Sequence, residues 1–506
     1  MKKNPVYILC CILAFGCSID LNKGITISKE EAMLREQVNN DYQHPVYHAS
    51  PPVYTMGDPN GLIQYKGVYH LFYQNHRPLH DSVSNTHWGH FTSTDLFHWK
   101  EQPVAISPED TWKQCYSGST VIYNDKPVAF FTGLSDKYPE VPCIAFSKDD
   151  DLNDWEQYEK NPIIAERPVG LPGGGFRDPY TWREGNRVFM ALASSTNIGG
   201  AVLLYSSEDL VNWKYHGPLY QGVIEPGGEG ELFECPSFYS FSNGLYILSY
   251  NKLYSINGKI APARRPVYMV GRYENYKFTP EYQADLDLFN ESWAPQTFKD
   301  EKGRYIQFAL SWCGRTDDAG WHGVQTMPRH VTMGDDNRLR FRPAGEHQSL
   351  LHNHRNYGGM KITQSDKNLL KDLKGDCMKL RVVFEPGFDA KKLGLIVRKS
   401  DDGKEFTRIF YDKEEKRMVA DRTHGGAEGS IYKNDRFERG QVELSEKEPL
   451  VIEVFLDKSI IEVFVNDDVA AGITRVFPSK NSLGIDLFSE GGSVVVRSVD
   501  AWDIEL

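Results

Sequence analysis

One short motif recurs along this chain at nearly constant spacing, and it limits the possible folds more than any other feature. The copies are Asp95-Leu96-Phe97-His98-Trp99, Asp151-Leu152-Asn153-Asp154-Trp155 and Asp209-Leu210-Val211-Asn212-Trp213, at offsets of 56 and 58 residues. Short β-type runs separated by turn residues precede each copy. A unit of this length with about four strands is typical of a propeller blade, whereas tandem sandwiches would repeat at roughly 100 residues.

The same unit continues in two further copies that lack the tryptophan motif. These copies start near Cys235 and Pro295, so residues 42–345 are expected to form a five-bladed β-propeller. After Pro343 the blade pattern stops, and we expect a polar linker over 346–367 and a β-sandwich over 368–506. The predicted fold class is therefore all-β, with a five-bladed propeller followed by a C-terminal sandwich.

Within the second domain, residues 450–456 and 460–465 alternate with period two on either side of Asp457-Lys458-Ser459. This pattern predicts a hairpin with one buried face. Glu453 and Glu462 alternate with valine and isoleucine in these strands, and we expect both carboxylates on the solvent face.

Composition excludes some classes of partner. Lys and Arg number 57 against 69 Asp and Glu, which gives a net charge of −12 and disfavours nucleic acid, since phosphates require cationic partners. Aromatic residues make up 12% of the chain, and with 43 Gly and 27 Pro they favour a turn-rich β protein. Such rings are compatible with sugar stacking, although core packing explains most of them.

The first residues have the order of a secretory signal, in which Lys2 and Lys3 precede the apolar stretch 6–15. The stretch is too short to span a bilayer. Ala14-Phe15-Gly16-Cys17 resembles a bacterial lipoprotein cleavage site, in which Cys17 would become the lipidated first residue. We therefore expect residues 1–17 to be a lipoprotein-type signal segment and residues 18–41 to be a tether. The expected location is outside the cytoplasm, anchored to a bacterial membrane. A plain signal peptide cut nearby is the alternative.

The cysteines give no sign of a disulfide framework or a structural metal. Five remain after the signal segment, which is an odd number, and none has C-x-x-C spacing. We expect no metal and no cofactor.

Three acids occupy equivalent places in different blades. Asp58 lies in Met56-Gly57-Asp58-Pro59-Asn60-Gly61, Asp178 in Phe176-Arg177-Asp178-Pro179, and Glu234 in Phe233-Glu234-Cys235-Pro236. Their separations of 120 and 56 residues are about two blade periods and one, and each acid comes just before the expected first strand of its blade. First strands line a propeller's axis, so we expect the three carboxylates at one mouth. Asp-Pro also starts many turns, so each acid taken singly could be structural.

Paired carboxylates are what glycoside hydrolysis needs, because one must be ionised to attack and the other protonated to release the leaving group. Asp58 lies in a glycine-rich turn, where backbone N–H groups would lower its pKa, and we expect it to be the nucleophile. Glu234 lies beside apolar Phe233 and is the expected proton donor. Arg177 would keep Asp178 ionised for hydrogen bonds to sugar hydroxyls.

At these residues the chain resembles family 32 of the glycoside hydrolases, the family of β-fructofuranosidases, invertases, inulinases and levanases. Besides the acids, the resemblance rests on Phe72-Tyr73-Gln74, His87-Trp88-Gly89-His90, Tyr116-Ser117-Gly118-Ser119, Trp293-Ala294-Pro295-Gln296-Thr297-Phe298 and Ile461-Glu462-Val463-Phe464-Val465-Asn466. It implies a propeller with a sandwich and retaining, metal-free hydrolysis of a fructosyl bond, in fructans or fructosyl oligosaccharides of the levan, inulin or sucrose type.

The resemblance also implies roles for single residues. It makes Asp58 the nucleophile, Glu234 the acid/base and Asp178 the transition-state stabiliser. Positions that line the family's fructosyl pocket match Gln74, Tyr116, Ser117, Arg177 and Cys235 here. With these we expect three more residues to bind substrate, namely Asn60, Trp88 and Trp312.

One departure from the family pattern affects the expected pocket. The family usually reads Trp-Met-Asn-Asp-Pro-Asn-Gly where this chain has Thr55-Met56-Gly57-Asp58-Pro59-Asn60-Gly61, so an aromatic wall and an asparagine are missing. Losing an aromatic wall would remove about 1 kcal/mol of sugar packing.

Two other functions are compatible with the same residues. One is an inverting five-bladed hydrolase of arabinofuranosides, which a carboxyl separation of roughly 6.5 Å or more, instead of about 5 Å, would indicate. The other is a surface glycan-binding lipoprotein that has kept the fold and lost activity.

Overall fold

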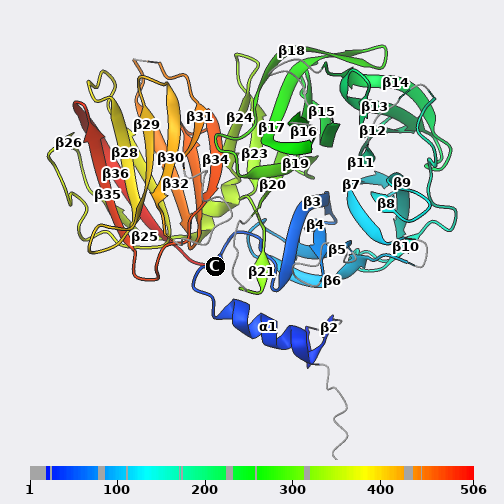
Figure 1. Cartoon of the computed structure of the whole chain (residues 1–506), viewed down its shortest axis with the longest axis horizontal. Coiled ribbons are helices and arrows are strands. Elements are labelled where there is room, and N and C mark those ends of the chain that lie inside the picture. Colours follow the sequence, from blue (N-terminus) through cyan, green and yellow to red (C-terminus); the bar gives the residue numbers. More distant parts are fainter. Residues whose placement is uncertain are drawn as a thin grey trace, which may run out of the picture.

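The computed structural model describes residues 19–22, 25–77, 86–109, 112–169, 171, 175–223, 232–256, 259–312, 319–426, 437–445 and 447–506. Two β-rich units lie side by side, a ring of blades built from the N-terminal part of the chain and a sandwich built from the C-terminal part (Figure 1). The predicted fold class is confirmed.

Five sheets form the blades, and apart from β21 (Trp321–His322), which pairs with β3 of the first blade, their strands are antiparallel and follow chain order from the centre outward. The first blade contains β3 (Tyr54–Tyr65), β4 (Val68–His76), β5 (Thr86–Ser93) and β6 (Lys100–Ile106). The second contains β7 (Gln114–Tyr123), β8 (Lys126–Leu134), β9 (Val141–Ser147) and β10 (Trp155–Gln157). The third contains β11 (Phe176–Glu184), β12 (Arg187–Thr196), β13 (Gly199–Ser207) and β14 (Lys214–Gln221). The fourth contains β15 (Leu232–Ser240), β16 (Tyr246–Ile256), β17 (Lys259–Glu274) and β18 (Lys277–Asp285). The fifth contains β19 (Ser292–Lys299), β20 (Tyr305–Ser311), β22 (Val324–Gln325), β23 (Arg329–Met333) and β24 (Leu339–Pro343).

The blades close into a ring around their first strands. β3, β7, β11, β15 and β19 pack each against the next, and β19 packs back against β3. A short strand from the last blade, β21 (Trp321–His322), pairs in parallel with the start of β3 and ties the two ends of the ring together. The first strand of every blade therefore lines the axis.

The repeated motif is the turn between the third and fourth strands of the first three blades. Its leucines, Leu96, Leu152 and Leu210, have left-handed φ values of 71°, 56° and 70°. In the first and third copies the aspartate at the start of the motif caps this turn. Asp95 Oδ1 accepts hydrogen bonds from the backbone N–H groups of residues 97 and 98, and Asp209 Oδ1 accepts them from residues 211 and 212. The motif recurs because these three blades have the same tight turn, which an Asp side chain stabilises locally.

Two sheets face each other in the second domain. One sheet contains β25 (Leu351–Asn356), β26 (Met360–Thr363), β27 (Cys377–Phe384), β32 (Leu450–Asp457), β33 (Ile460–Val465), β34 (Ala470–Arg475) and β36 (Ser493–Ile504). The other contains β28 (Lys392–Lys399), β29 (Phe406–Asp412), β30 (Arg417–His424), β31 (Phe437–Gln441) and β35 (Gly484–Glu490).

Two segments that were expected to be connectors have regular structure. The region 346–367 is not a linker, because β25 and β26 pair with β36 and belong to the sandwich, after the 3₁₀ helix η1 (Gly345–Leu350). The tether region 18–41 contains a hairpin of β1 (Ile19–Asn22) and β2 (Ile25–Ile27) and the helix α1 (Lys29–Asn39). Polar composition hid these elements, because β25 has no buried side chain and α1 buries the charged residues Glu31 and Arg35 together with Val38.

Helix α1 is held against the first blade. Ser28 caps its N-terminus by accepting from the backbone N–H of Glu31 at 3.0 Å. Arg35 then bridges Glu31 of its own helix and Glu101 of β6, with nitrogen–oxygen distances of 2.8 and 2.7 Å. None of the helices in the described residues is long and apolar enough to cross a membrane.

A network of buried charges joins the propeller to the sandwich. Arg329 of β23 lies between Asp287 of the propeller, 2.8 Å from its Nη1, and Glu462 of β33, 2.7 Å from its Nε. Glu462 also accepts from the backbone N–H of Met327 at 2.9 Å and lies 3.2 Å from the ring of His48. His48 lies 2.8 Å from Asp457 of β32 on its other side.

The hairpin over 450–465 is confirmed, but the expectation that Glu453 and Glu462 face solvent is wrong. One face of this hairpin lines the sandwich core and the other packs against the propeller, so both faces are buried from solvent. Burial disfavours the ionised form of Glu462, but Arg329 and His48 hold its pKa below the ordinary value. Glu453 is paired with Lys379 at 2.9 Å.

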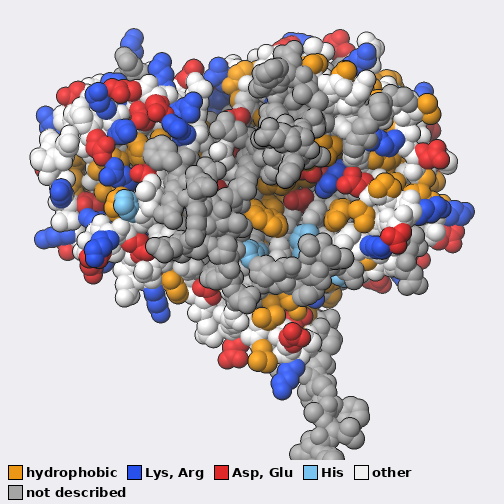
Figure 2. All heavy atoms as spheres, viewed as in Figure 1, with side chains coloured by type: hydrophobic (Ala, Val, Ile, Leu, Met, Phe, Trp, Pro, Cys, Tyr) orange, Lys and Arg blue, Asp and Glu red, His pale blue; other side chains and the backbone are white. Residues whose placement is uncertain are grey.

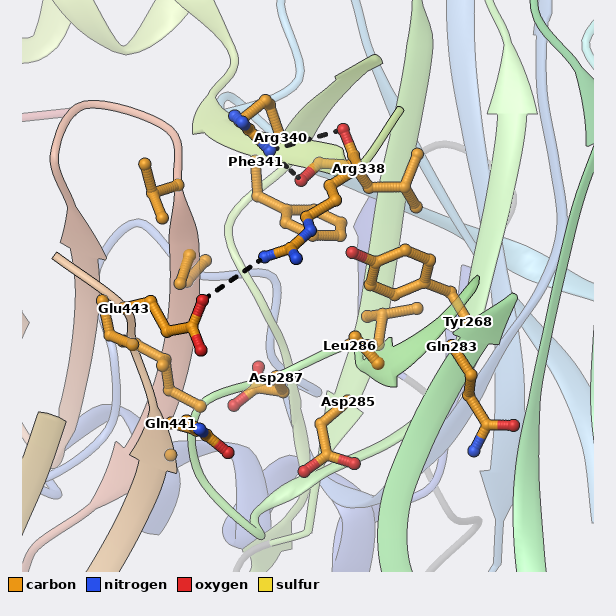
Figure 3. Close-up of a pocket in the computed structure, with 18 of the residues that line it drawn as sticks. Tyr268, Gln283, Asp285, Leu286, Asp287, Arg338, Arg340, Phe341, Gln441 and Glu443 are labelled. Atoms are coloured by element: carbon orange, nitrogen blue, oxygen red, sulfur yellow. Dashed lines mark hydrogen bonds and ion pairs between the residues drawn. The ribbon is translucent and has the colours of Figure 1, made fainter. Parts of the chain in front are cut away.

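Farther along the same interface lies a cavity of about 660 Å³. Figure 3 shows Tyr268 and Asp285 on its propeller side and Gln441 on its sandwich side, with Arg338 and Glu443 reaching toward each other across it at 4.0 Å. None of the three predicted catalytic acids lines this cavity.

Removing one partner of the buried network should destabilise the fold. Arg329→Met leaves the carboxylates of Asp287 and Glu462 buried without their cation, and we expect a loss of about 3–5 kcal/mol in the free energy of unfolding. Denaturant unfolding followed by tryptophan fluorescence measures it. Arg272→Met is the matched control, because Arg272 pairs with Glu281 on the exposed surface, and its loss should cost less than about 1 kcal/mol. Equal effects of the two substitutions would contradict the role of the network.

Candidate active site

The three acids lie near the beginnings of first strands, inside them and not just before them as expected. Asp58 is in β3, Asp178 in β11 and Glu234 in β15. The pairing register shifts directly around each acid, between 56 and 59, 177 and 180, and 234 and 237. Pro179 and Pro236 lie inside their shifts and Pro59 ends the first one, and because proline has no N–H to donate to the ladder, the strand bulges there. The bulges redirect the acids toward the axis.

Two of these bulges contain strained backbone. Asp178 and Cys235 have left-handed φ values of 56° and 49°, which non-glycine residues seldom adopt. Hydrogen bonds hold the strained backbone in place, since the Asp178 N–H donates to Thr132 Oγ1 at 2.8 Å and the Cys235 N–H donates to Asp178 Oδ2 at 3.0 Å. Strain of this kind persists only where surrounding contacts enforce it, and it is concentrated at functional sites.

Asp58 is buried, and three side chains from other strands surround one of its oxygens. Ser117 Oγ donates to Oδ2 at 2.6 Å, and Gln74 Nε2 donates to the same atom at 3.2 Å. The Cys235 sulfur lies 3.6 Å from this oxygen and also 3.6 Å from Asp178 Oδ2. Asp58 and Asp178 therefore converge on one thiol at the axis.

Arg177 links the other two acids. Its Nε lies 3.3 Å from Asp178 Oδ1 and its Nη1 lies 3.4 Å from Glu234 Oε1. The guanidinium lies over the ring of Tyr116, 5.8 Å from the centroid. Although burial disfavours its charge, the surrounding carboxylates raise the pKa of Arg177 well above its usual value, so it stays cationic.

The two acids expected to do chemistry differ in pKa, but not for the reason that the sequence suggested. The expected backbone donors to Asp58 are replaced by side-chain donors, and burial raises the pKa of Asp58 to about 6 in spite of the hydrogen bond from Ser117. Burial raises the pKa of Glu234 further, to about 7, with Arg177 opposing the shift and Asp178 adding to it. Between these values Asp58 is ionised and Glu234 protonated.

Two expected substrate-binding residues do not reach the pocket surface. Trp88 is fully buried in the core between blades and donates from Nε1 to the backbone carbonyl of Tyr116 at 2.9 Å. Asn60 is also fully buried. Its side-chain amide donates to the Pro59 carbonyl and accepts from the Gln74 N–H, both at 3.1 Å. Trp88 therefore supports the backbone of Tyr116, and Asn60 supports that of Gln74.

Trp312 lies at the rim. It directly follows β20, whose last residue Ser311 pairs with Ser292 at the start of β19. The acids also lie near the starts of first strands, so Trp312 is at the same end of the propeller. Its side chain is 40% exposed, which leaves its ring open to contact with a ligand.

Sequence reasoning missed two residues that complete the site. Glu140, just before β9, lies 3.1 Å from Arg177 Nη1 and is the third carboxylate on this guanidinium. Thr132 at the mouth end of β8 positions the backbone of Asp178. Neither has a local motif, and the only available signal was their place at the ends of blade strands that meet at the mouth.

Some expectations cannot be compared with the structure. Cys17 and the signal segment lie outside the described residues. In the described part of the chain, no group of three or more His, Cys, Asp or Glu side chains is arranged to hold a metal ion. The cysteines described, Cys115, Cys143, Cys235 and Cys377, are free thiols.

The arrangement has the equipment for acid-assisted nucleophilic substitution. It presents an ionised carboxylate, a protonated carboxylic acid and a third carboxylate within one mouth, all close to a fixed cation. Such a site can attack an acetal carbon, protonate the leaving oxygen and bind hydroxyl groups.

Comparisons with known proteins bear on this chemistry. Residues 48–343 match the model for the glycosyl hydrolases family 32 N-terminal domain, and residues 346–503 match that for the glycosyl hydrolases family 32 C terminal. A sucrose-6-phosphate hydrolase of Zymomonas mobilis is 30% identical over 491 residues, which cover 91% of this chain and 92% of that protein. The levanase of Bacillus subtilis is 26% identical over 91% of this chain and 70% of its own length. The crystal structure of fructan 1-exohydrolase IIa from Cichorium intybus superposes with a TM-score of 0.80 at 22% identity, over 92% of this chain and 98% of that one.

Proposed function

The chain belongs to family 32 of the glycoside hydrolases and hydrolyses β-fructofuranosidic bonds with retention, and we propose that Asp58, Glu234 and Asp178 carry out this reaction. We also propose that the enzyme is anchored outside the cytoplasm. Fructans and fructosyl oligosaccharides are its substrates. Family membership favours this activity over inverting arabinofuranoside hydrolysis and over an inactive binding protein.

The observation that supports these roles most is the different environment of the two acids in one mouth. Asp58 accepts two side-chain hydrogen bonds on one oxygen, which stabilise its ionised form. Glu234 is buried beside Phe233, and its pKa of about 7 lies above that of Asp58 at about 6. Two carboxyl groups with separated pKa values divide into a nucleophile and a proton donor.

In the first step, the Asp58 carboxylate attacks the anomeric carbon of the fructosyl ring and the bond from that carbon to the leaving oxygen breaks. Glu234 gives its proton to that oxygen, so the leaving group departs as an alcohol. In the second step, Glu234 takes a proton from water, whose oxygen attacks the same carbon and releases Asp58. Asp178, held by Arg177, accepts hydrogen bonds from ring hydroxyls as positive charge develops.

Activity should have a narrow, bell-shaped pH dependence. Below a pH of about 6 Asp58 becomes protonated and cannot attack, and above about 7 Glu234 loses the proton it must donate. We therefore expect kcat/KM for sucrose to be greatest between these values and to fall on both sides.

Glu234→Gln provides the control for this assignment. An aryl β-fructofuranoside with a p-nitrophenolate leaving group needs no proton to depart, so its cleavage should lose the alkaline limb in this variant and retain the acid limb. A wild-type profile that stays flat up to pH 9, or an alkaline limb that survives in Glu234→Gln, would contradict the assignment.

Product analysis tests the reaction and the nucleophile together. The full-length chain in detergent is incubated with sucrose, inulin, levan and arabinan, and we expect free fructose or fructo-oligosaccharides from at least one of the first three. Asp58→Asn should reduce turnover by several orders of magnitude without changing the unfolding temperature, because the covalent step is lost. Unchanged turnover in this variant would refute the assignment of Asp58 as the nucleophile. Fructan binding by the wild type without any product would support the alternative that the protein is an inactive glycan-binding protein.

We also propose that Cys17 carries the lipid that anchors the enzyme. The basic residues, the short apolar stretch and Gly16 before Cys17 support this proposal. In a bacterial host, the wild type should be recovered with membranes and labelled by a radioactive fatty acid. Cys17→Ser should lose the label and move to the soluble exported fraction, whereas Cys377→Ser is the control and should behave like the wild type. Loss of label without release from membranes would contradict anchoring through Cys17.

A further inference from the structure

Gly57, which directly precedes Asp58, is required for space and not for backbone conformation. Its φ lies outside the left-handed region, so the backbone would accept other residues. A Cβ atom built on Gly57, however, would lie 2.9 Å from Gln74 Cβ and 3.1 Å from His76 Nε2. The imidazole of His76 therefore occupies room that a side chain at position 57 would take.

His76 lies at the mouth of the propeller on the same face of β4 as Gln74. The two residues are separated by one position, and side chains two apart in a strand point to the same side. Gln74 binds the Asp58 carboxylate, so His76 is the next side chain toward solvent from the nucleophile. Figure 2 shows histidine side chains at the surface over the first blade, the blade to which β4 belongs.

The ring of His76 is fixed from one side. Its Nδ1 lies 3.1 Å from Thr86 Oγ1 of β5, and the Thr86 N–H donates to Gln114 Oε1 of β7 at 2.7 Å. This chain of contacts spans two blades, so the imidazole is held before any ligand arrives. Within the described residues, Nε2 has no hydrogen-bond partner.

The environment of the ring suits recognition of an uncharged hydroxyl. Burial lowers the pKa of His76, so the imidazole is largely neutral near pH 7. A neutral imidazole nitrogen exchanges one hydrogen bond with a sugar hydroxyl, as donor or acceptor according to its tautomer. A few fixed polar groups of this kind determine orientation and specificity in sugar-sized pockets.

We propose that His76 is a specificity-determining residue of this enzyme, whose Nε2 hydrogen bonds a hydroxyl of the fructosyl ring that Asp58 attacks. The imidazole thus places a polar group from β4 beside position 57, where the family pattern has an asparagine. This inference rests on the proposed function, because it takes Asp58 as the nucleophile.

The test uses the full-length enzyme and p-nitrophenyl β-fructofuranoside. The leaving group of this substrate is not a sugar, so it needs no second sugar-binding site. His76→Ala should lower kcat/KM by about 3- to 10-fold, the effect of one lost hydrogen bond. His76→Gln should recover most of that loss, because the glutamine amide reaches as far from the backbone as Nε2. His216→Ala is the control, since His216 bonds Ser206 in the outer part of the third blade and should leave activity unchanged.

Monodeoxy versions of the same substrate separate recognition from structural support. Each version lacks one hydroxyl of the fructosyl ring. Removing the hydroxyl that His76 binds should lower kcat/KM of the wild type but cause little further loss of kcat/KM in His76→Ala. The unfolding temperature of both His76 variants should match the wild type. An undiminished kcat/KM in His76→Ala, or an equal loss with every deoxy substrate, would overturn the inference. A wild type without activity on any fructoside would instead contradict the proposed function.

Discussion

The buried ion network between the two domains is the interaction on which the rest of the structure depends. Arg329 joins Asp287 of the propeller to Glu462 of the sandwich, with all three side chains fully buried. Gln325 of β22, which shortly precedes β23 and Arg329 in the chain, donates from its side chain to the Gly57 carbonyl at 2.9 Å. The Glu462 carboxylate of the sandwich is thus connected, through Arg329 and Gln325, to the backbone next to Asp58. A buried ion pair adds little stability overall, but losing either partner is costly, so the network fixes one arrangement of the domains.

Proline at the starts of the first strands imposes a second constraint, this time on the site itself. Because Pro59, Pro179 and Pro236 cannot donate to the sheet, each strand bulges next to its acid. The bulges bring three carboxylates from separate blades to one thiol and one guanidinium. Like charges at such short range favour neutralising one acid, and Glu234, whose pKa is raised to about 7 by burial and by the neighbouring carboxylates, is the one that keeps its proton.

The departure from the family pattern at Gly57 illustrates how such a site tolerates change. The missing asparagine does not leave a void, because even a Cβ atom at position 57 would lie 2.9 Å from Gln74 Cβ and 3.1 Å from His76 Nε2. The scaffold of blades keeps the three acids in place while a neighbouring strand supplies a different polar group. Reaction class and substrate preference are therefore carried by different residues of the same mouth.

The sequence by itself determined the features that are encoded locally. The Asp-Leu-x-x-Trp turn repeats because the first three blades share the same turn, so its spacing revealed the propeller. The acids were found because they lie in phase with this repeat. The tertiary structure alone decided what depends on residues distant in the chain. It covered the outer face of β33 with the propeller, buried Trp88 and Asn60, paired β25 and β26 with β36, and raised the pKa of Asp58. Burial and charge pairing come from whichever surface packs opposite, and no local pattern contains that information.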